Sequence, residues 1–147
     1  MKTLLKAVAL LMMAGSAAAA PAAQTGAPTV TITDAWFRAL PGQLPAGGYF
    51  TARNTGTRDL AITGAKSNGC GLLMLHESQN MGGMSSMNMA RSVPLPAGGS
   101  VAFAPGGYHL MCEQPKLKIG TPVSVVLSLS DGTSVAVRFA VRNAKGK

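Results

Sequence analysis

The sequence predicts an all-β protein, folded as a β-sandwich or a Greek-key barrel. Two C-terminal runs alternate apolar and other residues: VSVVLSL from residue 123 and SVAVRFAV from residue 134. A period of two is the pattern of a half-buried strand. Pro-Gly and Gly-Gly pairs separate the earlier runs, and after the N-terminal segment no stretch keeps a helical period over three turns. Many short strands divided by turn residues indicate a sandwich or barrel.

The expected strands follow one another closely, each rich in β-branched, aromatic or aliphatic residues. They cover residues 30–39, 48–53, 60–65, 72–76, 100–104, 123–130 and 134–141. Asp131-Gly132 lies between the last two and is a strong hairpin-turn signal. The length suits one such domain, which we place at residues 29–143.

The N-terminal segment has the order of regions typical of a secretory signal peptide. Lys2 and Lys6 precede an apolar run over residues 7–13, and small residues follow. The run is shorter than the roughly 20 residues that a transmembrane helix needs. We expect residues 1–19 to be a signal peptide cleaved after Ala19 and residues 20–28 to be a flexible leader. The mature chain would then lie in the periplasm without a transmembrane segment.

The charge of the chain favours acidic protein partners over nucleic acid. The formal net charge is +8, and losing Lys2 and Lys6 leaves 8 − 2 = +6. The remaining Lys and Arg residues are scattered and do not alternate with aromatic residues, so they form no stripe for nucleic acid. A positive surface aids solubility and docking onto acidic proteins.

Cys70 and Cys112 are the two cysteines of the sequence. In an exported protein an even pair is most simply a disulfide. The bridge would enclose 112 − 70 − 1 = 41 residues. In the chain-entropy model a loop of that length stabilises a fold by roughly 4 kcal/mol. The alternative is that Cys112, next to Met111, is a thiolate metal ligand or a redox thiol.

Both histidines fall in one pattern with two methionines, His-x10-Met-x21-His-x-Met, formed by His76, Met87, His109 and Met111. Imidazole and thioether are neutral, soft ligands that suit Cu(I) and suit calcium or magnesium poorly. His109 and Met111 are two residues apart, so in a strand their side chains share one face. We expect His76, at the end of its strand, to meet them.

Residues 81–89, MGGMSSMNM, contain four methionines. The glycines, serines and asparagine argue against a core segment, so we expect a flexible loop that closes over the metal. Met81, Met84 and Met89 are then auxiliary metal ligands. The alternative is a hydrophobic flap folded onto the sandwich, because methionine commonly fills gaps in cores.

These residues closely resemble the periplasmic copper chaperones of the PCu(A)C family, whose signature is His-x10-Met-x21-His-x-Met. Further blocks resemble the family in the same order, and the resemblance covers about residues 30–142. The blocks include Asp34-Ala35-Trp36, Gly47-Gly48-Tyr49-Phe50 and Pro105-Gly106-Gly107-Tyr108-His109. The two cysteines and the additional methionines of residues 81–89 are not part of the signature.

The resemblance implies a cupredoxin-like sandwich that binds one Cu(I) ion per chain near its surface. It also implies delivery of that copper to respiratory oxidase assembly, especially to the CuA centre of cytochrome c oxidase. We therefore expect a monomeric carrier whose partner is a copper-accepting protein or another periplasmic copper carrier.

Other classes of protein fit the sequence less well. A blue-copper electron-transfer protein would order its late ligands Cys, His, Met, whereas this chain has His109, Met111, Cys112. An enzyme is not expected, because the chain has no Cys-x-x-Cys pair and no paired-carboxylate spacing. A copper storage or resistance protein remains an alternative to the carrier. A metal-free interaction domain would leave the histidines and the methionine cluster without a role.

Overall fold

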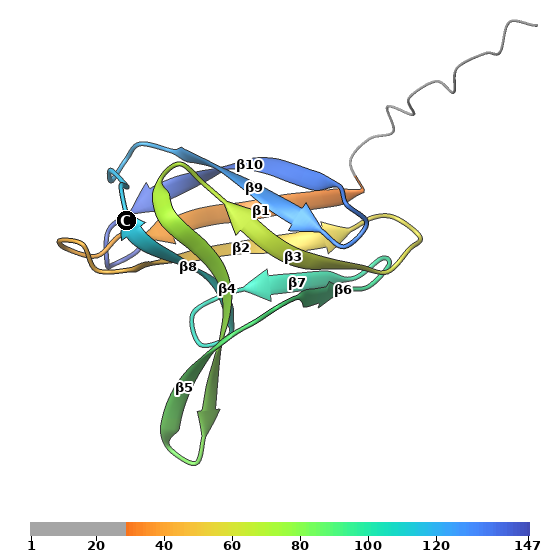
Figure 1. The fold of residues 1–147 in the computed structure, drawn as a ribbon, viewed down its shortest axis with the longest axis horizontal. Helices are drawn as coiled ribbons and strands as arrows, with labels where there is room; N and C mark the ends of the chain where they lie inside the picture. Colours follow the sequence, from red (N-terminus) through yellow and green to blue (C-terminus); the bar gives the residue numbers. More distant parts are fainter. Residues whose placement is uncertain (1–28) are drawn as a thin grey trace, which may run out of the picture.

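The computed structural model describes residues 29–147, which form ten β-strands and no helix (Figure 1). The expected signal peptide and leader lie outside these residues. The strands are β1 (Val30–Arg38), β2 (Ala46–Asn54), β3 (Leu60–Lys66), β4 (Cys70–Met81), β5 (Met84–Met89), β6 (Val93–Leu95), β7 (Ser100–Phe103), β8 (Tyr108–Pro115), β9 (Val123–Leu129) and β10 (Ser134–Arg142). The all-β prediction is confirmed. Residues 29–147 accordingly contain no apolar helix long enough to cross a membrane.

The strands are hydrogen-bonded in one continuous order, β5-β4-β8-β2-β1-β10-β9-β3-β6, with β7 paired to β2. The β1–β10 pair is parallel and the other pairs are antiparallel. Residues from both halves of this order belong to one buried cluster, among them Phe50 and Leu110 from one half and Ile62 and Leu127 from the other. The sheet therefore folds over on itself, and the two layers enclose the core (Figure 1).

Four phenylalanines occupy the centre of the core. The ring of Phe50 stacks on that of Phe103 at a centroid distance of 4.2 Å and meets the edge of Phe139 at 5.7 Å. Phe37 lies 5.0 Å from Phe139. Aromatic pairs at such separations stabilise a core beyond the burial of their area. They fix β1, β2, β7 and β10 against one another, and β2 in turn carries β8.

The predicted hairpin between β9 and β10 is confirmed. Ser128 pairs with Ser134, and Gly132 has a φ of 83°. The backbone N–H of Thr133 donates a hydrogen bond of 3.0 Å to Asp131 Oδ1. Asp and Gly form such turns readily, because Asp bonds to the backbone two residues on and Gly adopts positive φ without strain.

The expected loop over residues 81–89 is wrong, and so is the end of a strand at His76. β4 continues to Met81 and forms a hairpin with β5, in which Met81 pairs with Met84. Gly82 and Gly83 are the two turn residues, with φ of 59° and 82°. Two consecutive positive φ values suit a tight two-residue hairpin turn. This hairpin extends beyond the two layers (Figure 1).

Candidate metal centre

The two histidines face each other across neighbouring strands. His76 of β4 is the direct partner of His109 of β8. Their ring centroids are 5.8 Å apart and the rings are inclined by 67°. Metal–nitrogen bonds are about 2 Å long, so one ion between the rings is within reach of a nitrogen from each. The strand pairing itself therefore builds the nitrogen half of a site.

A glycine-rich turn fixes the position of His109. The turn precedes β8, where Gly106 has a φ of 86° and the N–H of Gly107 donates to Ala104 O at 3.1 Å. The carbonyl oxygen of Gly107 accepts a hydrogen bond of 3.1 Å from the N–H of Ser78. This second bond ties the turn to β4, on the strand that carries His76.

The hydrogen bond of His109 selects one tautomer of the neutral ring. His109 is 5 % exposed, and its Nδ1 lies 3.0 Å from Gly107 O. A carbonyl oxygen can only accept, so Nδ1 carries the hydrogen and Nε2 keeps a free lone pair. Metal-bound histidines commonly donate their other ring N–H in this way.

His76 has a buried Nδ1 atom with no hydrogen-bond partner in the described structure. Buried polar atoms are nearly always paired, so an orphan at this position indicates a missing partner. Burial lowers the pKa of His76 below its ordinary value, and the nearby His109 lowers it further, while Glu113 acts in the opposite direction. The neutral ring that results is the form that binds metals. The donor set therefore fits a soft cation.

Met87, His109 and Met111 line one cavity of about 240 Å³. Met111 follows His109 by two residues, and Met87 pairs with Ser78, two residues after His76. Side chains two residues apart in a strand share a face, so all four predicted ligands lie on one face of the β5-β4-β8 sheet. His76 is not among the residues that line the cavity and joins the group through its pair with His109.

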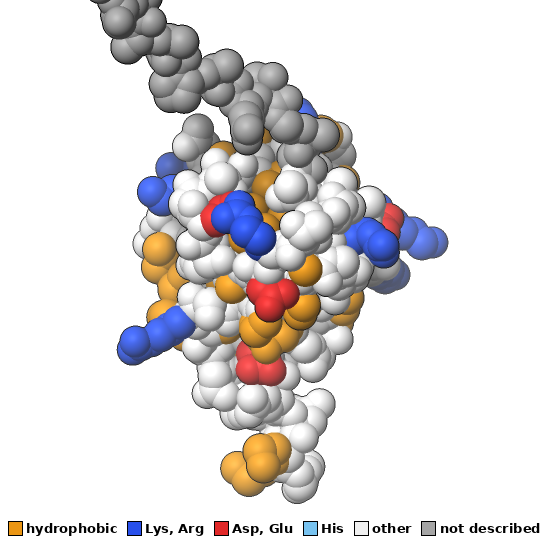
Figure 2. Space-filling view, turned by 90° about the vertical axis from the view of Figure 1, so that its right-hand side faces the viewer, with side chains coloured by type: hydrophobic (Ala, Val, Ile, Leu, Met, Phe, Trp, Pro, Cys, Tyr) orange, Lys and Arg blue, Asp and Glu red, His pale blue; other side chains and the backbone are white. Residues whose placement is uncertain are grey.

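The three auxiliary methionines have different positions. Met89 is the direct partner of His76 and shares its face. Met81 and Met84 pair with each other at the turn, on the opposite face by strand alternation. They are 74 % and 78 % exposed, and Figure 2 shows a small hydrophobic patch at the projecting end of the molecule. Met81 and Met84 therefore do not approach the histidines.

Met74 is the residue that the sequence pattern missed. It pairs directly with Met111 and precedes His76 by two residues on β4, so it also lies on the histidine face. No spacing rule in the signature includes it. Only the register between β4 and β8 places its thioether beside the predicted ligands.

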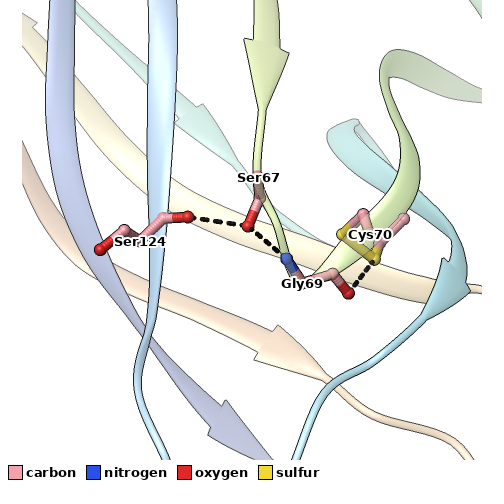
Figure 3. Close-up of a disulfide and its surroundings, with 5 residues drawn as sticks. Ser67, Gly69, Cys70 and Ser124 are labelled. Atoms are coloured by element: carbon pink, nitrogen blue, oxygen red, sulfur yellow. Dashed lines mark hydrogen bonds between the residues drawn. A yellow bond between two sulfur atoms is a disulfide. The ribbon is translucent and has the colours of Figure 1, made fainter.

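Cys70 and Cys112 form the predicted disulfide, with their Cα atoms 5.3 Å apart (Figure 3). It joins β4 to β8, the strands that carry the two histidines. Gly69 N–H donates to Ser67 Oγ at 3.2 Å, and Ser67 Oγ donates to Ser124 O at 2.7 Å, which fixes the turn before Cys70 (Figure 3). Because Cys112 is bridged, it is not a thiolate ligand. A blue-copper site requires a cysteine thiolate, so the structure does not support that alternative.

One arginine lies at the cavity. Arg38 lines it, and its guanidinium carbon lies 5.8 Å from the centre of the Tyr49 ring. Within residues 29–147, no three His, Cys, Asp or Glu side chains come together as a metal site. The donors are thus neutral nitrogen and thioether sulfur, a set with no carboxylate for a hard cation.

The fold is similar to that of solved PCuAC domains. The apo PCuAC domain from PmoF1 superposes with a TM-score of 0.67 at 21 % identity, over 79 % of this chain and 95 % of that one. The structure of CuI-DR1885 from Deinococcus radiodurans gives a TM-score of 0.64 at 26 % identity, over 81 % of each chain. The cupredoxin-like fold and the resemblance seen in the motifs are confirmed.

The chain belongs to the LpqE-like family. The model of that family, described as "Putative lipoprotein LpqE-like", matches residues 30–141. A relative from Leifsonia xyli subsp. xyli (strain CTCB07), "Putative lipoprotein Lxx21020", is 35 % identical over 144 residues, which cover 93 % of this chain and 86 % of the relative. The matched region contains every candidate ligand described above.

Proposed function

We propose that this protein is an exported metallochaperone that binds one Cu(I) ion through His76, Met87, His109 and Met111. The observation that carries the proposal is the cross-strand pair of histidine rings, 5.8 Å apart, with Met87 and Met111 on the same face. Two similar structures support it, a copper-bound PCuAC domain from PmoF2 and CuI-DR1885.

The ligand chemistry explains why the cargo would be cuprous. Neutral imidazole and thioether ligands suit the singly charged, soft Cu(I) ion, and thioethers select it over harder cations. Met87 is 54 % exposed on the projecting hairpin. A partner ligand can therefore approach the ion from that side and displace Met87 first, so that copper passes by ligand exchange without being released into solvent.

The recipient in this proposal is a copper-accepting protein outside the cytoplasm, with the CuA centre of cytochrome c oxidase as the specific candidate. In this proposal the chain's own residues bind and release the ion, and no catalytic residue is proposed. The word "lipoprotein" occurs in the names of the matching family and of the relative from Leifsonia xyli, and it describes those proteins. Both cysteines of this sequence form the disulfide, so lipid attachment to a cysteine of these residues is not part of the proposal.

Anaerobic titration with Cu(I) in the presence of a competing chelator tests the binding. We expect one tightly bound ion per chain and an X-ray absorption spectrum with both nitrogen and sulfur neighbours. His76→Ala should weaken binding, while Met84→Leu, a change at the hairpin turn, should not. No uptake of Cu(I), or a shell of oxygen alone, would refute the proposal.

A further inference from the structure

We infer that Met74 and Met89 form a second, weaker Cu(I) site that shares His76 with the first. This inference rests on the proposed function, because it assigns an exit or entry position to the same cargo. Neither methionine belongs to the four-residue pattern, and the register of three strands brings both next to His76.

The register supplies the geometry. Met89 is directly opposite His76 on β5, and Met74 lies two residues before His76 on β4. Directly opposed side chains in an antiparallel pair have Cβ atoms about 5 Å apart, and diagonal neighbours remain within reach when the side chains are long. Methionine is long and flexible. Met74, His76 and Met89 can therefore turn toward one ion.

Residues around His76 line two separate cavities, although His76 itself lines neither of them. The first is lined by Ser78 and Met87, which pair with each other, together with His109 and Met111. The second, of about 530 Å³, is lined by Met74 and Met89. Met89 is directly opposite His76, and Met74 is directly opposite Met111. His76, with its orphaned Nδ1, therefore has thioethers of both sets as neighbours.

The surroundings make the second site the weaker one. Lys66 and Arg91 line the second cavity, and their positive charges oppose the binding of a cation. Met89 is 66 % exposed, so its side chain is less fixed than that of a buried ligand. A weak site at the surface suits an ion in transit.

Passage between the sites is a ligand exchange at constant oxidation state. The bonds from copper to Met87, Met111 and His109 break as bonds to Met74 and Met89 form, while a nitrogen of His76 stays bound. Copper remains Cu(I) throughout, no proton is transferred, and no other reactant is required.

Anaerobic Cu(I) titration of the full chain, with ¹³C-labelled methionine methyl groups observed by NMR, tests the inference. We expect the first equivalent to shift the signals of Met87 and Met111. A neutral imidazole has one free lone pair, so His76 stays on the first ion and a second, weaker equivalent should shift the signals of Met74 and Met89 through their thioethers alone. The variant Met74→Leu/Met89→Leu should lower affinity for the second ion about tenfold or more, the range seen when groups around a metal are removed. The matched variant Met81→Leu/Met84→Leu makes the same chemical change at the hairpin turn and should leave both steps unchanged.

The outcomes separate this inference from the proposed function. Normal binding of the first equivalent, with Met74 and Met89 signals unmoved up to several equivalents, would overturn the second site and leave the carrier intact. A second step that survives in Met74→Leu/Met89→Leu but is lost in Met81→Leu/Met84→Leu would also overturn it, and would place the additional copper at the hairpin turn. Failure of the first equivalent would instead remove the proposed function itself.

Discussion

His109 is the most firmly held of the proposed ligands, because its ring is buried and its Nδ1 is bonded to Gly107 O. His109→Ala should lower Cu(I) affinity by 10- to 100-fold or more, since no neighbouring side chain can take the place of a fixed ring nitrogen. Competition with a Cu(I) chelator measures the change. Met84→Ala is the control, because Met84 lies at the hairpin turn. Equal losses in the two variants would contradict the assignment of His109.

The pKa of His76 gives a second test at the scale of one side chain. Burial, assisted by His109, lowers this pKa from 6.5, so in the apo protein the ring should titrate below pH 6.5 in an NMR titration. The unfolded chain takes up this proton at a higher pH than the folded chain, so the folded state loses stability as the pH falls through the lowered pKa. A midpoint at or above 6.5 would show that the ring is not buried as described.

Among the elements, β4 and β8 carry both histidines and the disulfide, but at different positions along the strands. His76 pairs with His109, whereas Cys112 is opposite Leu73 and Cys70 is opposite Pro115. The ladder between β4 and β8 therefore holds the histidines together without needing the bridge. The bridge acts on the stability of the whole chain instead.

Removing the bridge should lower the free energy of unfolding by up to roughly 4 kcal/mol while Cu(I) binding persists. The variant Cys70→Ala/Cys112→Ala is preferred to chemical reduction, because free thiols would themselves bind Cu(I). Thermal melting gives the stability, and chelator competition gives the affinity. Thiol counting on the unfolded natural protein should find no free thiol. Loss of Cu(I) affinity along with the bridge would mean that the ladder alone does not position the rings.

The sequence predicted some elements and missed others for physical reasons. β9 and β10 were predicted because one face of each is buried, which produces alternation, and Asp131-Gly132 marks their turn. β5 was missed because all six of its side chains are exposed. Its sequence therefore lacks the alternation of apolar and polar residues that would predict a strand. Its pairing with β4 decides its structure. The end of β4 was misplaced at His76 for the same reason, because polar residues follow that position.

The candidate ligands show the same division. His76, Met87, His109 and Met111 could be proposed from spacing, because two residues along a strand fix a shared face. Spacing alone could not identify Met74 as a neighbour of the ligands, nor could it show that Met89 lies near His76 while Met84 does not. These positions depend on which residue of β4 faces which residue of β8 and β5. That register cannot be predicted from one sequence.

For the whole molecule, the site lies where the projecting hairpin joins the sandwich (Figure 1). Arg38 lines one cavity there, and Lys66 and Arg91 line the other. These cationic side chains favour approach by an acidic partner. Met87 is exposed on the same hairpin, so the acceptor would reach the ion from there.

Transfer of copper is the central claim, and stopped-flow mixing of the Cu(I)-loaded protein with an apo CuA domain tests it most directly. We expect transfer to be faster than release of Cu(I) to a non-docking chelator of matched affinity, and to slow as salt screens the charges of the two proteins. Transfer no faster than release to the chelator would contradict the carrier, and copper storage would then be the better account.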